Sequence, residues 1–163
     1  MRRTLLRLVS LLAVAVLVFA GCSSDDDSDS GSGSKSTTTS EGSEEANQQD
    51  IDRLTEAAGI DGKVNAEDEV SAKPKDGKLE TELDNFYFGP AFIEAEAGST
   101  ITLTLHNEGD TDHTFTIDSA GIDQTVSPGE ETNVEVQVPD TGSLNYYCRF
   151  HRGSGMQGAI IVS

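Results

Sequence analysis

The sequence has few of the residues on which most enzymes and nucleic-acid-binding proteins depend. It contains three histidines, two cysteines, two methionines and no tryptophan in 163 residues. There are only 11 lysines and arginines against 29 aspartates and glutamates, which gives a net charge of −18. Such a charge repels nucleic acid and anionic lipid head groups, so a polynucleotide partner is not expected. The sequence also lacks a phosphate-cradling glycine loop and a serine in a nucleophile motif, which disfavours nucleotide binding and serine hydrolysis.

The first 21 residues predict an export signal rather than part of a folded domain. Residues 1–7 carry three arginines, and the apolar run 8–20 that follows is too short for a membrane span. The sequence Phe19-Ala20-Gly21-Cys22 resembles a bacterial lipobox, in which small residues precede a cysteine that is lipidated and becomes the new N-terminus. We therefore expect Cys22 to anchor the protein outside the cytoplasm. A plain signal peptide or an uncleaved anchor is the alternative, and the route (general or twin-arginine export) stays open.

Lipidation of Cys22 would leave Cys148 without a partner for an intramolecular disulfide. The loss of residues 1–21 would also remove three arginines and bring the net charge to −21. An unpaired thiol in an oxidising compartment is a liability unless it is buried or bound to a metal. The surroundings of Cys148 are therefore the first place to look for function.

Residues 22–77 predict a tether. The stretch 23–50 is rich in serine, glycine and acidic residues and has no aromatic side chain, so it cannot bury enough apolar surface to fold. A flexible coil of about 25 residues spans about 30 Å on average, enough to hold a domain away from a membrane. Within residues 51–70, the apolar residues before Gly59 have helical spacing and predict a short helix; they are Ile51, Leu54, Ala57 and Ala58.

From residue 78 onward the sequence predicts a β-sandwich. Apolar and polar residues alternate in segments 78–83, 101–105, 113–117 and 134–138, and the apolar segment 158–162 closes the chain. Turn sequences rich in glycine, proline, asparagine and aspartate separate them. Short strands at this spacing are typical of an antiparallel sandwich, and residues 78–163 suffice for one small core. We therefore expect a signal peptide (1–21), a tether (22–77) and one all-β domain (78–163).

Four residues of this domain form a set with metal-binding character. His113 lies in a predicted strand, whereas Cys148, His151 and Met156 lie on the loop before the last strand. Two histidines, a cysteine and a weak axial methionine are the ligands of a blue copper electron-transfer site. A buried cysteine or methionine taken singly is more often an ordinary core residue, so the hypothesis depends on the whole set. Zinc could use the same nitrogens and sulfur, but methionine is not expected around it.

The motif Cys148-x₂-His151-x₄-Met156, preceded by Tyr147 and followed by Gly158 and an apolar strand, resembles the ligand loop of plastocyanin-type cupredoxins. The upstream sequence FGPAFIEAEAGSTITLTLHNEGDTDHTFTI resembles the same family, and the resemblance covers residues 78–163. It implies a Greek-key β-sandwich (cupredoxin-like), one mononuclear type 1 copper and single-electron transfer. The implied copper ligands are His113, Cys148, His151 and Met156.

The sequence departs from the family pattern at a few positions. Thr114 follows the first ligand, where asparagine is common, and the ligand loop carries Arg149, Phe150 and Arg152, which are bulkier or more charged than in many relatives. None of these changes removes a ligand. They bear on the reduction potential and on the docking face, not on the metal.

The predicted function is that of a lipid-anchored, monomeric copper protein that carries single electrons between envelope redox partners such as a cytochrome, an oxidase or a reductase. The protein would transform no small-molecule substrate and would not be an enzyme. His151, at the rim of the loop, is the electron port that the resemblance implies. Copper capture or delivery to an envelope cuproenzyme is the alternative, because it uses the same ligands.

The distribution of charge, His106 and Asn107 each allow two interpretations. Residues 141–163 contain no acidic residue, whereas residues 78–140 contain 14 acids and one lysine. Arg149 and Arg152 thus predict a neutral to positive copper end that faces a partner, or else simply a solvated loop. His106 is expected in solvent, with a second weak metal site as the alternative. Asn107 either supports the ligand loops by hydrogen bonds or forms a turn.

Overall fold

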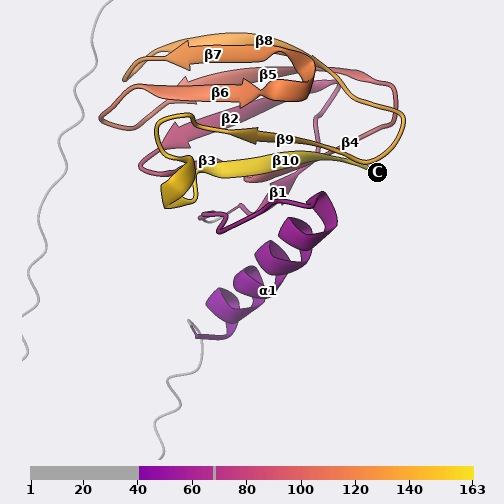
Figure 1. The fold of residues 1–163 in the computed structure, drawn as a ribbon, viewed down its shortest axis with the longest axis vertical. Coiled ribbons are helices and arrows are strands. Elements are labelled where there is room, and N and C mark those ends of the chain that lie inside the picture. Colours follow the sequence, from indigo (N-terminus) through magenta and orange to yellow (C-terminus); the bar gives the residue numbers. More distant parts are fainter. Residues whose placement is uncertain (1–40, 68) are drawn as a thin grey trace, which may run out of the picture. The chain divides into compact units, whose positions relative to one another are not determined.

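The computed structural model describes residues 41–67 and 69–163, so the predicted signal peptide, Cys22 and much of the predicted tether lie outside the described residues. Within this range one helix, α1 (Glu41–Ala58), precedes ten strands (Figure 1). The strands are β1 (Ser71–Ala72), β2 (Lys78–Asp84), β3 (Tyr87–Gly89), β4 (Phe92–Ala95), β5 (Thr100–Asn107), β6 (His113–Ile117), β7 (Ile122–Val126), β8 (Glu131–Gln137), β9 (Ser143–Tyr147) and β10 (Gln157–Val162). Two single-turn 3₁₀ helices, η1 (Asp118–Ala120) and η2 (Arg152–Ser154), complete the set. None of the helices described has the length and apolar character that crossing a membrane requires.

Two sheets form the sandwich, as the alternating segments predict. The larger sheet has the order β1-β4-β10-β9-β6-β7 and the smaller has the order β3-β2-β5-β8 (Figure 1). The all-β prediction is confirmed, but the pairing is not purely antiparallel. Strand β4 runs parallel to β1 and β10, and β2 runs parallel to β5, because the chain crosses between the sheets instead of forming only hairpins.

Strand alternation determines which side chains fill the space between the sheets. In β5, Ile101, Leu103 and Leu105 are at most 2% exposed, while the threonines between them point outward. Aromatic rings close the core: the ring of Phe115 lies 5.9 Å from Phe88 and 4.7 Å from Tyr146. Strand β9, which ends at the residue before Cys148, is thereby fixed in the centre of the sandwich.

The core position of Tyr146 is anchored by hydrogen bonds. Its hydroxyl donates to the carbonyl oxygens of Ala91 (2.9 Å) and Pro90 (3.1 Å), and burial raises the pKa of this phenol well above its usual range. The neighbouring Tyr147 points the other way and is half-buried. One tyrosine of the pair is thus a core residue and the other lies at the surface, as the alternation predicts.

A second apolar cluster shows where the N-terminal part of the described chain packs. Ile51, Leu54 and Ala58 of α1 lie with Phe92 and Ala159, whereas Ile93 and Ile160 face the main core. Because adjacent strand residues point to opposite faces, α1 covers the outer face of the larger sheet. Val64 and Val70 extend the same cluster.

The helix differs from the sequence expectation at its start. Helicity was expected only around residues 51–58, but α1 begins at Glu41, within the predicted tether. The middle of the helix carries contacts about one turn apart, from Gln48 to Asp52 (2.8 Å) and from Arg53 to Asp50 (3.1 Å). Apolar packing fixes the second half of the helix, and adding residues to the N-terminal end of an existing helix avoids the unfavourable nucleation step. The spacing of apolar residues cannot predict this extension, because the added residues are polar.

Gly158 provides a test of the close packing behind the metal-ligand loop. It lies opposite Tyr146 in the β9–β10 ladder, and an added Cβ would overlap the Ala91 oxygen and lie 2.8 Å from the Tyr146 ring. We expect Gly158→Ala to lower the free energy of unfolding by about 3 kcal/mol, measured by urea denaturation of the metal-free protein. The control, Gly153→Ala, has nothing within 4 Å of the added methyl and should change stability by less than about 0.5 kcal/mol. Equal effects would contradict this account of the packing.

Candidate metal centre

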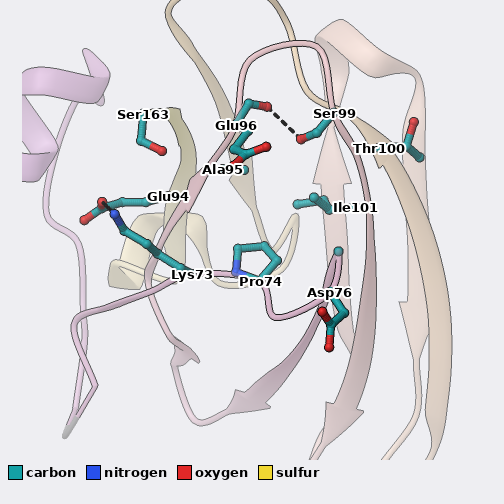
Figure 2. A pocket seen from close by; sticks show the side chains of 11 residues that line it. Lys73, Pro74, Asp76, Glu94, Ala95, Glu96, Ser99, Thr100, Ile101 and Ser163 are labelled. Carbon is teal, nitrogen blue, oxygen red and sulfur yellow. Dashed lines mark hydrogen bonds and ion pairs between the residues drawn. The ribbon is translucent and has the colours of Figure 1, made fainter.

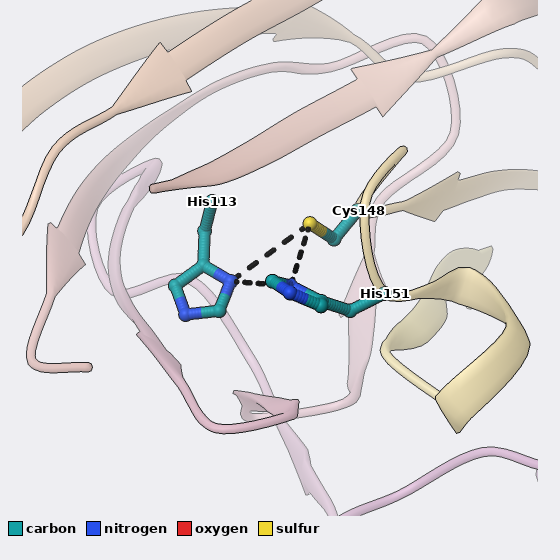
Figure 3. Close-up of side chains that lie close together, drawn as sticks. All are labelled: His113, Cys148 and His151. Carbon is teal, nitrogen blue, oxygen red and sulfur yellow. Dashed lines mark hydrogen bonds between the residues drawn. The ribbon is translucent and has the colours of Figure 1, made fainter. Parts of the chain in front are cut away.

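Three of the four predicted ligands meet at one end of the sandwich. His113 is the first residue of β6, Cys148 follows β9 directly, and His151 lies three residues further on. The Cys148 Sγ lies 3.8 Å from His113 Nδ1 and 3.5 Å from His151 Nδ1, and the two nitrogens are 3.1 Å apart (Figure 3). Among the histidine, cysteine, aspartate and glutamate side chains of the described residues, these three form a group close enough together to share one ion.

The donor atoms fit a single metal ion. Bonds of about 2.0 Å to nitrogen and 2.3 Å to sulfur, spread around an ion in a plane, separate the donors by about 3.5 to 3.8 Å. The three observed distances lie close to that range. A cysteine sulfur with two imidazole nitrogens is the equatorial donor set of blue copper sites.

The fourth predicted ligand, Met156, closes the same loop and is fully buried. Its backbone N–H donates to the His151 oxygen (3.2 Å), and its own oxygen accepts from the Cys148 N–H (3.0 Å). Met156 is thus tied by its backbone to two of the other three residues of the set.

The ligand loop is built by a tight turn. The Cys148 carbonyl accepts hydrogen bonds from the N–H groups of His151 (3.1 Å) and Arg152 (2.8 Å), which brings the His151 side chain back toward the sulfur. Gly155 has φ +100°, and an added Cβ there would lie 2.7 Å from Asn65 Oδ1. The turn therefore requires glycine at Gly155, whereas an added Cβ at Gly153 would meet open space.

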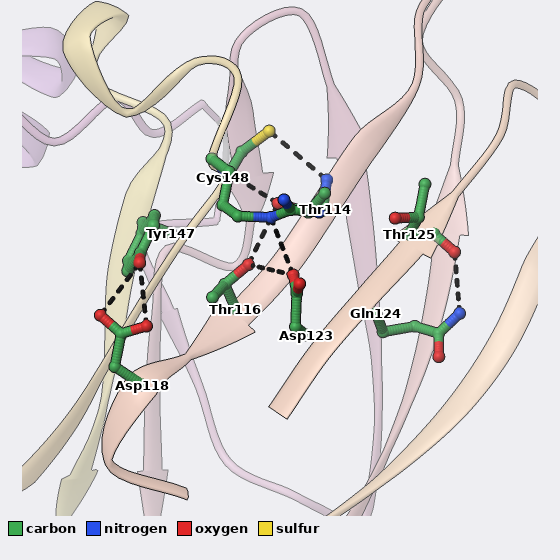
Figure 4. Close-up of polar contacts among 9 residues, drawn as sticks. Thr114, Thr116, Asp118, Asp123, Gln124, Thr125, Tyr147 and Cys148 are labelled. Atoms are coloured by element: carbon green, nitrogen blue, oxygen red, sulfur yellow. Dashed lines mark hydrogen bonds and ion pairs between the residues drawn. The ribbon is translucent and has the colours of Figure 1, made fainter. Parts of the chain in front are cut away.

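Thr114 joins the strand of His113 to the loop of Cys148. Its backbone N–H points at the Cys148 Sγ (3.4 Å), and its hydroxyl accepts a hydrogen bond from the Arg149 N–H (2.8 Å), within the polar network drawn in Figure 4. The Thr116 hydroxyl donates to Thr114 Oγ1 (3.1 Å). A threonine at this departure from the family pattern thus positions the sulfur and the loop together.

Asn107 organises the turn that leads to His113. Its buried amide donates to the oxygens of Thr111 and Val126 (both 2.8 Å), and its Oδ1 accepts from the Gly109 N–H (2.9 Å). An added Cβ at Gly109 would lie 2.8 Å from His113 Nε2. The two interpretations of Asn107 therefore coincide, because the turn that it forms is the one that holds a ligand.

Burial shapes the electrostatics of the site. It lowers the pKa of His113, with a further lowering from His151, while Asp84 and Asp112 act in the opposite direction. Burial also lowers the pKa of His151. Both shifts favour the neutral imidazole, which is the form that binds a metal. Cys148 is fully buried, so the unpaired thiol is shielded from the surroundings.

Two contributors to the site were not recognised in the sequence. The ring of Phe86 lies 4.3 Å from the His151 ring, and the side chain is 37% exposed. Asn65, in the predicted tether, hydrogen-bonds the ligand loop through Ser154 O (2.9 Å). Neither has a periodicity or motif that could have revealed it, because both contacts depend on how distant loops meet.

Other features lie apart from this centre. His106 is half-exposed and its Nδ1 lies 3.1 Å from Glu108, in agreement with the solvated role expected for it. A cavity of about 380 Å³ is lined by Lys73, Glu94 and Ser163 among others (Figure 2). Because Ser163 follows the last residue of β10 and Met156 precedes the first, this cavity lies at the opposite end of that strand.

The arginines of the ligand loop have acidic or aromatic neighbours. Arg149 Nε lies 2.9 Å from Asp123, and the Arg152 guanidinium lies 4.5 Å from the centre of the Tyr147 ring. The Tyr147 hydroxyl in turn donates to Asp118 (2.9 Å; Figure 4). Acidic residues outside the ligand loop therefore balance part of the positive charge that Arg149 and Arg152 bring to the ligand end of the sandwich.

Comparisons with known proteins agree with the geometry. The family model described as a cupredoxin-like domain matches residues 63–162, and so includes residues 63–77, which the sequence placed in the tether. The chloroplastic plastocyanin of Tetradesmus obliquus is 27% identical over 124 residues, which cover 69% of this chain and 82% of that protein.

Solved structures give further similarities. Dithionite-reduced auracyanin from Roseiflexus castenholzii has a TM-score of 0.48 at 16% identity, over 53% of this chain and 97% of that one. Oxidised plastocyanin from Dryopteris crassirhizoma has a TM-score of 0.41 at 25% identity, over 52% of this chain and 100% of that one.

Removal of the Asn107 amide tests how the His113 turn is held. Asn107→Ala would leave three backbone groups without their partner, and we expect a loss of about 3 kcal/mol in the free energy of unfolding. Urea denaturation of the metal-free protein measures it. Asn133→Ala, which removes one exposed hydrogen bond to Thr104, should cost less than about 1 kcal/mol. If the two variants were equally stable, Asn107 would not hold the turn.

Proposed function

The chain belongs to the cupredoxin-like family, and from this premise we propose that it carries single electrons at one type 1 copper ion held by His113, Cys148, His151 and Met156. The observation that carries the proposal is the convergence of two imidazoles and one thiol, with their donor atoms within 4.8 Å of one another. When bound, copper supplies the one-electron couple between Cu(I) and Cu(II).

The residues around the site support repeated electron transfer without loss of shape. His113 and Cys148 lie at the ends of paired strands, and their positions are linked through Thr114. His113, Cys148 and Met156 are each 0% exposed, so water is kept from most of the donor set. A rigid, dry set of ligands is suited to two oxidation states that share one geometry.

The surface around His151 supports its role as the electron port. Among the described residues, the large hydrophobic side chains that are exposed are Phe86 (37%) and Phe150 (56%). Both lie beside His151, with ring centres 4.3 Å and 6.2 Å from its own. Exposed aromatic side chains gathered at one place favour contact with another protein, so a redox partner would dock here.

Copper delivery is the less supported alternative. A donor of metal must open its ligands to an acceptor, but three of the four proposed ligands are fully buried. The burial favours retention of the ion.

Export and a lipid at Cys22 remain part of the proposal, and they rest on the sequence of residues 1–22 alone. In that setting the protein is a monomer tethered outside the cytoplasmic membrane.

Addition of Cu(II) to the full chain tests the proposed site. We expect one equivalent to bind and to produce an intense thiolate-to-copper absorption band in the visible region, because Cys148 is the sulfur donor. Cys148→Ser should abolish the band, whereas Cys22→Ser, which removes the other cysteine, should leave it unchanged. A colourless protein that takes up zinc equally well would rule out the type 1 site.

Charge reversal tests the orientation of docking. We expect replacement of Arg149 and Arg152 by glutamate to slow electron self-exchange at low ionic strength by about tenfold. The wild-type arginines offset nearby acids such as Asp123, whereas the variant would add two further negative charges there, so that two such ends would repel each other. Nuclear magnetic resonance line broadening in mixtures of oxidised and reduced protein measures the rate. Replacement of Lys73 and Lys75 by glutamate makes the same change in net charge away from the port and should have a smaller effect. Equal slowing in both variants would show that only the net charge matters.

A further inference from the structure

The segment between α1 and β1 reaches the metal-ligand loop through one residue. Asn65 Nδ2 donates to the carbonyl oxygens of Phe86 (2.8 Å) and Ser154 (2.9 Å). The Asn65 backbone N–H donates to the Gly155 oxygen (2.9 Å). Phe86 lies between β2 and β3 of the smaller sheet, and Ser154 lies between β9 and β10 of the larger. A single side chain thus connects loops from both sheets at the end where the ligands meet.

The segment that carries Asn65 is itself fastened next to the loop. Gln157, only 4% exposed and adjacent to Met156, donates from Nε2 to the oxygens of Lys63 (2.8 Å) and Asp61 (3.2 Å). Val64 is 4% exposed in the apolar cluster under α1. Hydrogen bonds and apolar burial therefore place Asn65 before it makes any contact with the ligand loop.

The fit between Asn65 and the loop is close. An added Cβ at Gly155 would lie 2.7 Å from Asn65 Oδ1 and 2.9 Å from its Cγ, so the loop can approach only without a side chain at this position. Residues 154 and 155 lie between the ligands His151 and Met156, and the other loop carries the Phe86 ring against His151. Movement of either loop would change the surroundings of His151.

We propose that Asn65 is a positioning residue of the copper centre, and that residues 61–65 form a clasp that slows the loss of copper. The proposal rests on the proposed function in assuming that copper occupies the site. The clasp holds the loop from His151 to Met156 in its closed form and keeps Phe86 over the outer side of His151. Asn65 acts through these loops and does not itself touch the metal.

The size of the effect follows from the hydrogen bonds involved. Loss of the two bonds from Nδ2 removes the side-chain hydrogen bonds with which Asn65 holds the two loops. We expect opening of the loop to become about tenfold more frequent, which corresponds to about 1.4 kcal/mol. Release of the ion requires that opening, so its rate should rise by a similar factor.

The experiment uses the full chain with Asn65→Leu, which keeps the branched shape of the side chain but has no donor, and Asn65→Ala as a second variant. Two rates are measured: hydrogen exchange of the amides of residues 151–156 in the metal-free protein, and transfer of Cu(I) from the loaded protein to excess bicinchoninate. We expect both rates to rise about tenfold in both variants. Asn133→Ala, on the exposed face of β8, should leave both unchanged.

The two measurements separate the possible failures. Wild-type rates in both variants would overturn the clasp, and so would an equal rise in exchange at the core amides of β5 and β9, which would show a loss of global stability instead. If the wild-type chain bound no copper, the proposed function would fail. The exchange of the loop in the metal-free protein would still decide whether Asn65 holds it closed.

Discussion

The site depends on how β6 and β9 come together and then separate. The two strands are neighbours in the larger sheet, and they pair at Thr116 and Tyr147. Beyond this point the backbones part, and Thr114 spans the opening with one contact to the Cys148 sulfur and one to the Arg149 N–H. Because His113 begins β6 and Cys148 directly follows β9, the separation of the strands sets the space for an ion. The sheet therefore places His113 and Cys148, and the loop between β9 and β10 adds His151 and Met156. Ligands held in place in this way suit the proposed cycling between oxidation states with little movement.

The rest of the chain protects that space from different sides. Tyr146 ties the end of β9 to the aromatic core, and Asn107 holds the turn that leads to His113. The ligand loop is closed by its own backbone hydrogen bonds and is held from outside by Asn65. What remains open is the side of His151 between two phenylalanines. The proposed retention of the ion and the proposed electron port at His151 both depend on this arrangement.

Much of this could be predicted from the sequence, for identifiable reasons. The alternation of apolar and polar residues in β5 and β6 predicted the sandwich. The scarcity of histidine, cysteine and methionine left few residues from which a metal site could be formed. The N-terminal boundary was harder, because α1 and β1 owe their places to packing against β4 and β10. Asn65 and Phe86 could not have been predicted, since Asn65 contacts a residue 89 positions away and Phe86 stacks on a ring supplied by another loop. Patterns of neighbouring residues carry no information about contacts between loops that are distant in sequence.

X-ray absorption at the copper edge, recorded on the loaded protein in both oxidation states, tests the central claim most directly. The account predicts one sulfur and two nitrogen neighbours at short range in Cu(II) and in Cu(I), at nearly the same distances, because the sheet fixes the donors. Replacement of the sulfur by oxygen neighbours, or a change in the number of donors on reduction, would contradict it.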